Sequence, residues 1–375
     1  MKIVLVFLIC ALLVMVFPKK YVMVAFFLNS IAIAWLAYTL STVNQYDLVY
    51  HLDLYDNMSG KGLEYVFSHF YFKQSPLYVL YVYCLGFLKN KHLLPAVSTF
   101  IGYFSFASIL NYFIKKEDFS KIKYVAIYFF ILCTLPWHDF SAGIRGALAF
   151  TLCSLAVFFD LVKGKSKLGL IIYVLAIFVH QSAIIALFTR LVLFFTKKLN
   201  KKGSFGLVCV CMLLFSVLSG AVSQVLILLA NGTGLSIINV IAHSFEAYII
   251  GGTDLYEYSV VIIRAMTIVV VLFIIYMCGI RMGNEYDRKC SIIRYYLLFI
   301  CLTFSYIGQY DIFCRYSVAS ILLSSMVLSC CGDAPITFKL GNIFDRSYGF
   351  VLVSFSTLVL ICYYVIYYSK WVFGG

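Results

Sequence analysis

Long apolar runs separated by short polar segments dominate the pattern along the chain. The run at 168–195 is too long for one membrane crossing and is interrupted at 180–182, which predicts a hairpin of two short helices. The pattern therefore predicts an all-α, polytopic integral membrane protein with about 12 transmembrane helices. The runs cover approximately 3–17, 21–42, 93–114, 123–136, 143–162, 168–195, 204–230, 258–280, 291–309, 316–331 and 348–368.

The composition agrees with this prediction and excludes a soluble protein. Of the 375 residues, 63% are hydrophobic and 12% are charged, whereas roughly 25% of the residues of a soluble domain are charged. No polar stretch is long enough for a separate soluble domain, so we expect residues 1–375 to form a single transmembrane domain. The 13 Cys residues include no CxxC pair, and therefore indicate neither a disulfide framework nor a zinc site.

Clusters of Lys and Arg give the expected orientation, because basic loops of membrane proteins stay in the cytoplasm. On this reading the net charge of +13 is a topology signal and does not indicate nucleic-acid binding. All clusters stay inside only if the apolar run 76–88 does not cross the membrane. We therefore expect 43–92 to be an extracytoplasmic segment with an interfacial or re-entrant helix, and 231–257 to be a second extracytoplasmic loop. The clusters lie at 19–20, 115–123, 163–167, 197–202, 281–289 and 339–346.

Three Arg residues at the predicted outer face are candidates for binding an anion. Arg145 lies in the first turn of an inward helix, where free backbone N–H groups and the helix dipole also attract an anion. Arg315 begins a second such helix, and Arg264 lies within the first two turns of a third. The alternative is structural: Arg145 could reach lipid phosphates or pair with Asp139, and Arg315 could pair with Asp311.

His180 and Gln181 begin another inward helix and form a polar cluster in an otherwise apolar hairpin. A histidine at this depth is a candidate proton donor, proton acceptor or phosphate ligand. The alternative is a hydrogen bond that ties the turn of the hairpin together.

The segment 46–56 places carboxylates, a histidine and aromatic residues together after the second span. Carboxylates activate sugar hydroxyls and aromatic faces stack on sugar rings, so Asp47 and Tyr50 are candidates for binding carbohydrate. An interfacial aromatic belt with solvated acids is the alternative. His138 and Asp139 adjoin the Arg145 turn and are expected to support the same site.

Several of these residues lie in motifs that resemble the EpsG family, which is grouped with the Wzy-type polysaccharide polymerases. The family usually has a polar residue after the Arg where this chain has Gly146, and often an Asp-Tyr pair where this chain has Asp47-Leu48. The motifs in this chain are Asp47-Leu-Val-Tyr50, Gly143-Ile-Arg145-Gly-Ala-Leu-Ala149, Leu175-Ala-Ile-Phe-Val-His180-Gln-Ser182 and Arg315-Tyr316.

The resemblance implies a glycosyltransferase of the bacterial inner membrane that resembles the GT-C class and works at the extracytoplasmic face. It would join oligosaccharide repeat units that are linked to undecaprenyl diphosphate and serve as donor and acceptor. Its expected partners are these two substrates, the membrane lipid and a chain-length regulator. No nucleotide or redox cofactor is needed, because the diphosphate is the leaving group. No residue is assigned to a metal, and the metal requirement stays open. The expected roles are catalytic for Asp47, His180 and Arg145, and substrate-binding for Arg315, Arg264, Tyr50, His138, Asp139, Gln181 and Tyr316.

Some alternatives stay open at the level of sequence. Either Asp47 or His180 could deprotonate the acceptor hydroxyl. A lipid-linked oligosaccharide flippase or another transporter would also be polytopic and basic, but its charges are expected in a central cavity. A glycan ligase has the same chemistry as a polymerase, and a membrane O-acetyltransferase would need a histidine near the cytoplasmic side.

Overall fold

The computed structural model describes residues 2–40, 46–117, 119–196, 202–215, 255–277, 288–331 and 341–362. Within these ranges the regular elements are all helices, which confirms the predicted helical fold class. The described helices that are long and apolar enough to cross a membrane are Lys19–Tyr38, Leu93–Lys116, Ile144–Val162 and Tyr310–Cys331, with shorter apolar helices beside them. The number of about 12 crossings and the resemblance to the GT-C class stay predictions.

The helices have the following bounds. The first half of the chain forms α1 (Lys2–Val16), η1 (Lys19–Tyr21), α2 (Val22–Tyr38), α3 (Tyr46–Met58), α4 (Leu63–Ser68), α5 (Phe70–Gln74), α6 (Pro76–Gly86), α7 (Leu93–Lys116), α8 (Lys121–Thr134), α9 (Trp137–Ser141), α10 (Ile144–Val157) and η2 (Phe158–Val162). The second half forms α11 (Ser166–Val179), η3 (Gln181–Ala183), α12 (Ile184–Thr196), α13 (Lys202–Leu213), α16 (Leu255–Met277), α17 (Arg288–Ser305), α18 (Tyr310–Cys331) and α19 (Gly341–Val359). Of the predicted loop 231–257, residues 231–254 lie outside the described residues.

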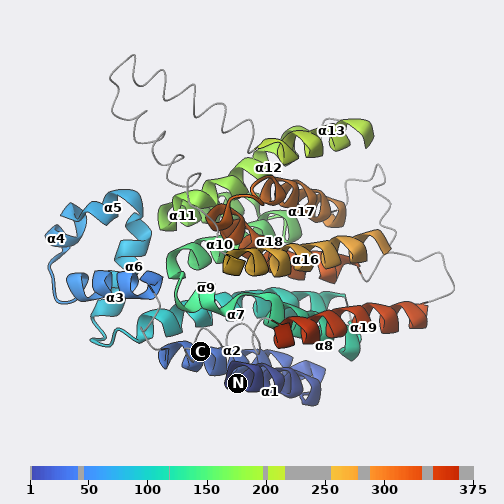
Figure 1. Ribbon diagram of the computed structural model, residues 1–375, viewed down its shortest axis with the longest axis horizontal. Helices are drawn as coiled ribbons and strands as arrows, with labels where there is room; N and C mark the ends of the chain where they lie inside the picture. Colours follow the sequence, from blue (N-terminus) through green and yellow to red (C-terminus); the bar gives the residue numbers. More distant parts are fainter. Residues whose placement is uncertain are drawn as a thin grey trace.

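The long helices run side by side in one bundle (Figure 1), with α2 packed on α7, α8 on α19, α10 on α11, and both α16 and α17 on α18. Helix α18 is the most buried of the membrane-length helices, with 83% of its apolar window inside the protein. Large apolar side chains are exposed on peripheral helices, for example Trp35 at 63% and Phe195 at 63%. Such a surface suits a lipid environment, in which an exposed apolar side chain costs nothing.

The bundle has two chemically different ends. Lys115 and Lys116 end α7 and Lys121 begins α8, so these three residues flank the turn between the two helices, and the turn between η2 and α11 carries Lys163. The two turns lie at the same end, because the Lys163 ammonium lies 5.1 Å from the ring centre of Tyr112 near the end of α7. Helices α8 and α11 both run away from this basic end, α8 toward α9 and α11 toward the break before η3.

The basic end also contains a buried ion pair that joins η2 to α12. The Asp160 carboxylate accepts hydrogen bonds from Nε and Nη2 of Arg190, and its Oδ1 accepts a third from Ser166 Oγ at 2.7 Å. The two charged side chains are 5% and 19% exposed. A buried charge is tolerated in this way only when it is paired and hydrogen-bonded, so the pair fixes how these helices approach each other.

The segment between α2 and α7 folds into the short helices α3 to α6, which gather at the other end of the bundle (Figure 1). Helix α6 has 11 residues and is therefore about 16 Å long, about half the thickness of a hydrocarbon core. It packs on α3, α5 and α11. Its placement as an interfacial or re-entrant helix stays a prediction.

Cysteine labelling tests this topology. In a background in which the exposed Cys84 and Cys211 are replaced by Ser, we expect reporters at the exposed positions Glu64 and Lys91 to react with an impermeant maleimide added outside. A reporter at the exposed Lys121 is expected to react only after the cells are opened, because basic clusters stay in the cytoplasm. Protection of Lys91 from outside, with labelling after opening, would mean that α6 crosses the membrane.

Candidate functional site

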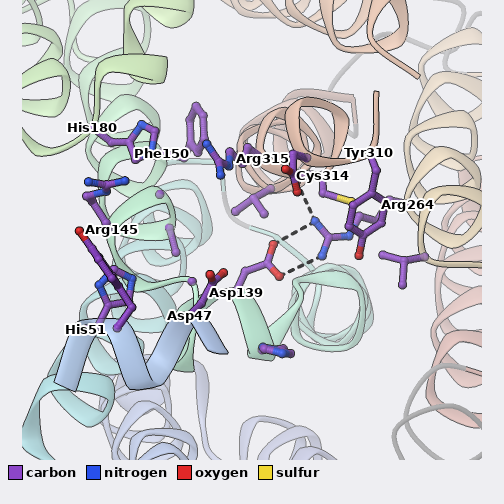
Figure 2. A pocket seen from close by; sticks show the side chains of 18 residues that line it. Asp47, His51, Asp139, Arg145, Phe150, His180, Arg264, Tyr310, Cys314 and Arg315 are labelled. Atoms are coloured by element: carbon purple, nitrogen blue, oxygen red, sulfur yellow. Dashed lines mark hydrogen bonds and ion pairs between the residues drawn. The ribbon is translucent and has the colours of Figure 1, made fainter. Parts of the chain in front are cut away.

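A cavity of about 400 Å³ lies at the end of the bundle opposite the basic turns. Its walls are formed by α3, α9, the N-terminal halves of α10, α16 and α18, and the break between α11 and η3 (Figure 2). This volume lies within the usual range of small-molecule sites. The charged and titratable residues that line it include three acids, three Arg and three His: Asp47, Asp139, Asp311, Arg145, Arg264, Arg315, His51, His138 and His180.

The structure brings most of the predicted site residues together in this one cavity. Those that line it are Asp47, Tyr50, His138, Asp139, Arg145, His180, Arg264 and Arg315. Gln181 is exposed, its amide donates to the Gln74 carbonyl at 3.5 Å, and it is not among the lining residues. Tyr316 packs edge-on against the ring of Phe150, with centroids 6.0 Å apart, and so lies behind a lining residue. Substrate contact by Gln181 and Tyr316 stays a prediction.

Arg145 is placed by the start of α10. Gly143 is the N-cap residue, so Arg145 is the second residue of the helix, and the first N–H groups of a helix have no partner within it. At Gly146, where the family usually has a polar side chain, an added Cβ would meet nothing within 4 Å. This departure from the family pattern therefore leaves open space beside Arg145. Within the described part of the chain Arg145 forms no ion pair, so its guanidinium fork is available to a ligand.

Arg264, by contrast, binds groups of the chain itself. Its Nη1 and Nη2 donate to the two carboxylate oxygens of Asp139 at 2.9 Å each, and Nη1 also donates to the Cys314 carbonyl at 2.7 Å (Figure 2). The Arg264 side chain is 7% exposed and that of Asp139 is 26% exposed. The alternative prediction from the sequence, in which Arg145 pairs with Asp139, is therefore wrong. The geometry makes Arg264 the group that orients Asp139, and direct contact between Arg264 and a substrate stays a prediction.

His180 occupies the break between α11 and η3, where its backbone is extended with φ −153° and ψ 125°. The backbone N–H of Ser182 donates to its Nδ1 at 3.1 Å, and Ser182 Oγ lies 2.7 Å from the same nitrogen. Burial, and then the charges of Arg145 and Arg315, lower the pKa of His180 to about 3. The ring is therefore neutral near pH 7, and its Nδ1 already accepts a hydrogen bond.

Asp47 lies in the first turn of α3, where the positive end of the helix dipole favours a carboxylate. Its side chain is exposed and reaches the cavity (Figure 2). Its charge also acts on the half-buried His138, whose pKa is lowered mainly by desolvation. Asp47 and His138 therefore share one part of the cavity, although they come from α3 and α9.

Several lining residues are not among the predicted site residues, including His51, Phe150, Tyr310, Asp311 and Cys314. His51 had a usable signal, because residues 47, 50 and 51 follow the i, i+3, i+4 spacing of one helix face. On α18 the lining residues Asp311, Cys314, Arg315 and Val318 follow the same spacing. The composition of the segment 46–56 indicates carbohydrate binding, whereas its helical spacing indicates which side chains share one face.

Comparison with known proteins agrees with the resemblance seen in the motifs. The model of the EpsG family matches residues 24–372, which include every residue that lines the cavity. No curated protein and no solved structure matches the chain. The chain therefore belongs to the EpsG family, a family of Wzy-like polysaccharide polymerases.

Proposed function

We propose that this chain joins undecaprenyl-diphosphate-linked oligosaccharide repeat units at the outer face of the bacterial inner membrane. The family supports a polymerase of the glycosyltransferase type. The position of Arg145 supports a diphosphate-linked donor. Arg145 lies at a helix N-terminus, lines the cavity and forms no ion pair within the described residues. A diphosphate is the kind of ligand that such a fork and such a helix end bind together.

The positions of the basic clusters support a cavity at the outer face of the membrane. The described Lys clusters at 115–123 and at 163–167 lie at the end opposite the cavity. Because basic loops stay in the cytoplasm, the cavity would open at the extracytoplasmic level, where lipid diphosphate headgroups lie. A transporter is less well supported, since the charged residues line one end of the bundle rather than its middle.

In the proposed mechanism Arg145 and Arg315 bind the donor diphosphate. The bond between the anomeric carbon of the donor sugar and the diphosphate oxygen breaks, and the two guanidinium groups stabilise the negative charge that develops on the leaving group. Both Arg residues act on the pKa of His180, so His180 lies within the field of both. The N-terminus of α10 adds its dipole beside Arg145. The prediction that Arg315 begins its helix is wrong, because α18 begins at Tyr310 and Arg315 is its sixth residue.

Asp47 is the proposed general base for the acceptor. It would take the proton of the acceptor hydroxyl as the oxygen of that group bonds to the anomeric carbon. His180 is the weaker candidate, because its Nδ1 accepts the Ser182 N–H and its Nε2 then carries the proton of the neutral ring. Tyr50 and Phe150 supply aromatic faces for sugar rings, and Asp139, held by Arg264, supplies acceptor oxygens for sugar hydroxyls.

The lipid-linked glycans of a strain that lacks this chain test the proposal. We expect single undecaprenyl-linked repeat units to accumulate at the outer face without a ladder of longer products, and the parent chain to restore the ladder. Repeat units trapped on the cytoplasmic side would indicate a flippase. A normal ladder of lipid-linked polymer that is not transferred onward would indicate a ligase. Either of these two results would contradict the proposal.

The pH dependence of polymer formation tests whether the His180 ring is neutral in the parent chain. The pKa of His180 is lowered from its usual value near 6.5 to about 3, so the ring stays neutral until the pH approaches 3. We therefore expect no loss of activity from titration of His180 between about pH 8 and pH 5. The measurement is the rate of polymer formation in membrane vesicles across this range. An acid limb near neutrality in the parent that is absent from His180→Gln would show that His180 gains its proton in this range, which would contradict the lowered pKa.

A further inference from the structure

Two histidines from distant segments flank Arg145. His51 on α3 and His180 after α11 both line the cavity, and Figure 2 shows the Arg145 guanidinium between their rings. The two residues are 5% and 9% exposed. Burial, followed by the Arg145 charge, lowers the pKa of each ring to about 3, and for His180 the charge of Arg315 and the neighbouring His51 act in the same direction. Both rings are therefore neutral near pH 7.

The tautomer of His180 follows from its contact with the main chain. A backbone N–H is always a donor, so the Nδ1 that receives the Ser182 N–H at 3.1 Å must be an acceptor. A neutral imidazole has one N–H, which is then on Nε2. The ring consequently offers one hydrogen-bond donor on the side away from its own turn.

The tautomer of His51 follows from a buried hydroxyl. Tyr78 Oη lies 2.8 Å from His51 Nδ1, and the Tyr78 side chain is 1% exposed. If Nδ1 were the donor, the Tyr78 proton would be buried without an acceptor in the described part of the chain, which costs the full desolvation of that group. Donation from Tyr78 to Nδ1 satisfies both atoms. His51 therefore also carries its proton on Nε2.

We propose that His51 and His180 present two neutral Nε2–H donors to the anion bound by Arg145, and that Tyr78 is a positioning residue that fixes the tautomer of His51. The proposal rests on the proposed function for the identity of that anion, a lipid diphosphate. Arg145 and Arg315 already place two positive charges in the cavity. A protonated His180 would be repelled by both charges and a protonated His51 by that of Arg145. Neutral donors instead add directed hydrogen bonds without further charge.

Substitutions that keep or remove the Nε2 donor separate this role from that of a base. A Gln amide nitrogen matches the position of the histidine Nε2, whereas an Asn amide reaches only as far as Nδ1. With undecaprenyl diphosphate added to the purified chain in detergent, we expect His51→Gln and His180→Gln to bind within about threefold of the parent. We expect His51→Asn and His180→Asn to bind about 10- to 100-fold more weakly, as for loss of a hydrogen bond to a charged group. Equal binding by the Gln and Asn variants at either position would overturn the proposal for that residue.

Nitrogen-15 NMR of selectively labelled histidines tests the tautomers without any substrate. In the parent chain we expect His51 and His180 to show the Nε2–H pattern and to keep it down to about pH 5. Tyr78→Phe is expected to convert His51 to a mixture of tautomers. Tyr81→Phe is the matched control, because Tyr81 lies one turn further along α6 and bonds Ser98 Oγ at 2.8 Å, outside the cavity lining. An Nδ1–H pattern in the parent, or no change in Tyr78→Phe, would overturn the proposal.

These readouts separate the inference from the proposed function. If the parent shows the two Nε2–H tautomers and binds undecaprenyl diphosphate but forms no polymer, the polymerase proposal fails and the donor pair stands. If the parent forms polymer while its histidines show the other tautomer, the donor pair fails and the polymerase proposal stands.

Discussion

Replacing Arg145 with Lys is expected to lower the rate of polymer formation by about 30- to 1,000-fold, although the positive charge is kept. A diphosphate presents paired oxygens to the planar two-donor fork of an Arg, and an ammonium group cannot form the same pair of bonds. Losing such a contact in the transition state costs about 2 to 4 kcal/mol. The measurement is polymer formed by membrane vesicles that contain equal amounts of each variant.

Arg294→Lys is a suitable control for this experiment. Arg294 is half-buried on α17, stacks over the ring of Phe205 at 5.7 Å and does not line the cavity. We expect this variant to stay close to the rate of the parent. A rate for Arg145→Lys close to that of the parent would contradict binding of the diphosphate by Arg145. It would indicate that Arg145 only anchors the helix at the membrane surface.

Replacing Asp47 with Asn is expected to lower turnover by about 100- to 10,000-fold, the usual contribution of a general base. The amide keeps the size of the carboxylate but cannot accept the hydroxyl proton. Binding of the lipid-linked donor should change little, because that step depends on the Arg residues. The two measurements are the rate of polymer formation and the affinity for undecaprenyl diphosphate.

Asp53→Asn provides the matched control, since Asp53 is exposed on the same helix and does not line the cavity. We expect it to retain the rate of the parent. If Asp47→Asn were also as active as the parent while His180→Gln lost activity, the base would be His180. The donor role inferred for His180 predicts the opposite result, because Gln preserves a donor at the position of Nε2.

The helical fold could be predicted from sequence because its cause is local. Apolar runs of membrane length and basic turns between them identify helices and their order without knowledge of packing. The placement of Arg145 at a helix start was predictable for the same reason, since Gly143 and the following apolar residues mark that start. Helix existence depends on neighbouring residues, and these are visible in the sequence.

The pairing of Asp139 with Arg264 could not be predicted, because the two residues are 125 positions apart and meet only when α9 and α16 pack near α18. Arg145 is nearer to Asp139 in the sequence, but the packing of the helices brings Arg264 to Asp139 instead. His51 is an intermediate case. Its place on the face shared by Asp47 and Tyr50 follows from helical spacing, but its contact with Tyr78 depends on how α6 packs on α3.

Reconstitution of the purified chain shows directly whether it forms new glycosidic linkages. Proteoliposomes would contain the chain and a single glycan substrate, an undecaprenyl-diphosphate-linked repeat unit, and both the glycan products and the released undecaprenyl diphosphate would be measured over time. We expect a ladder of longer lipid-linked glycans, with one undecaprenyl diphosphate released for each new linkage, and we expect both signals to be strongly reduced in Arg145→Lys. Movement of the intact lipid-linked unit across the bilayer, with no ladder and no released undecaprenyl diphosphate, would contradict it.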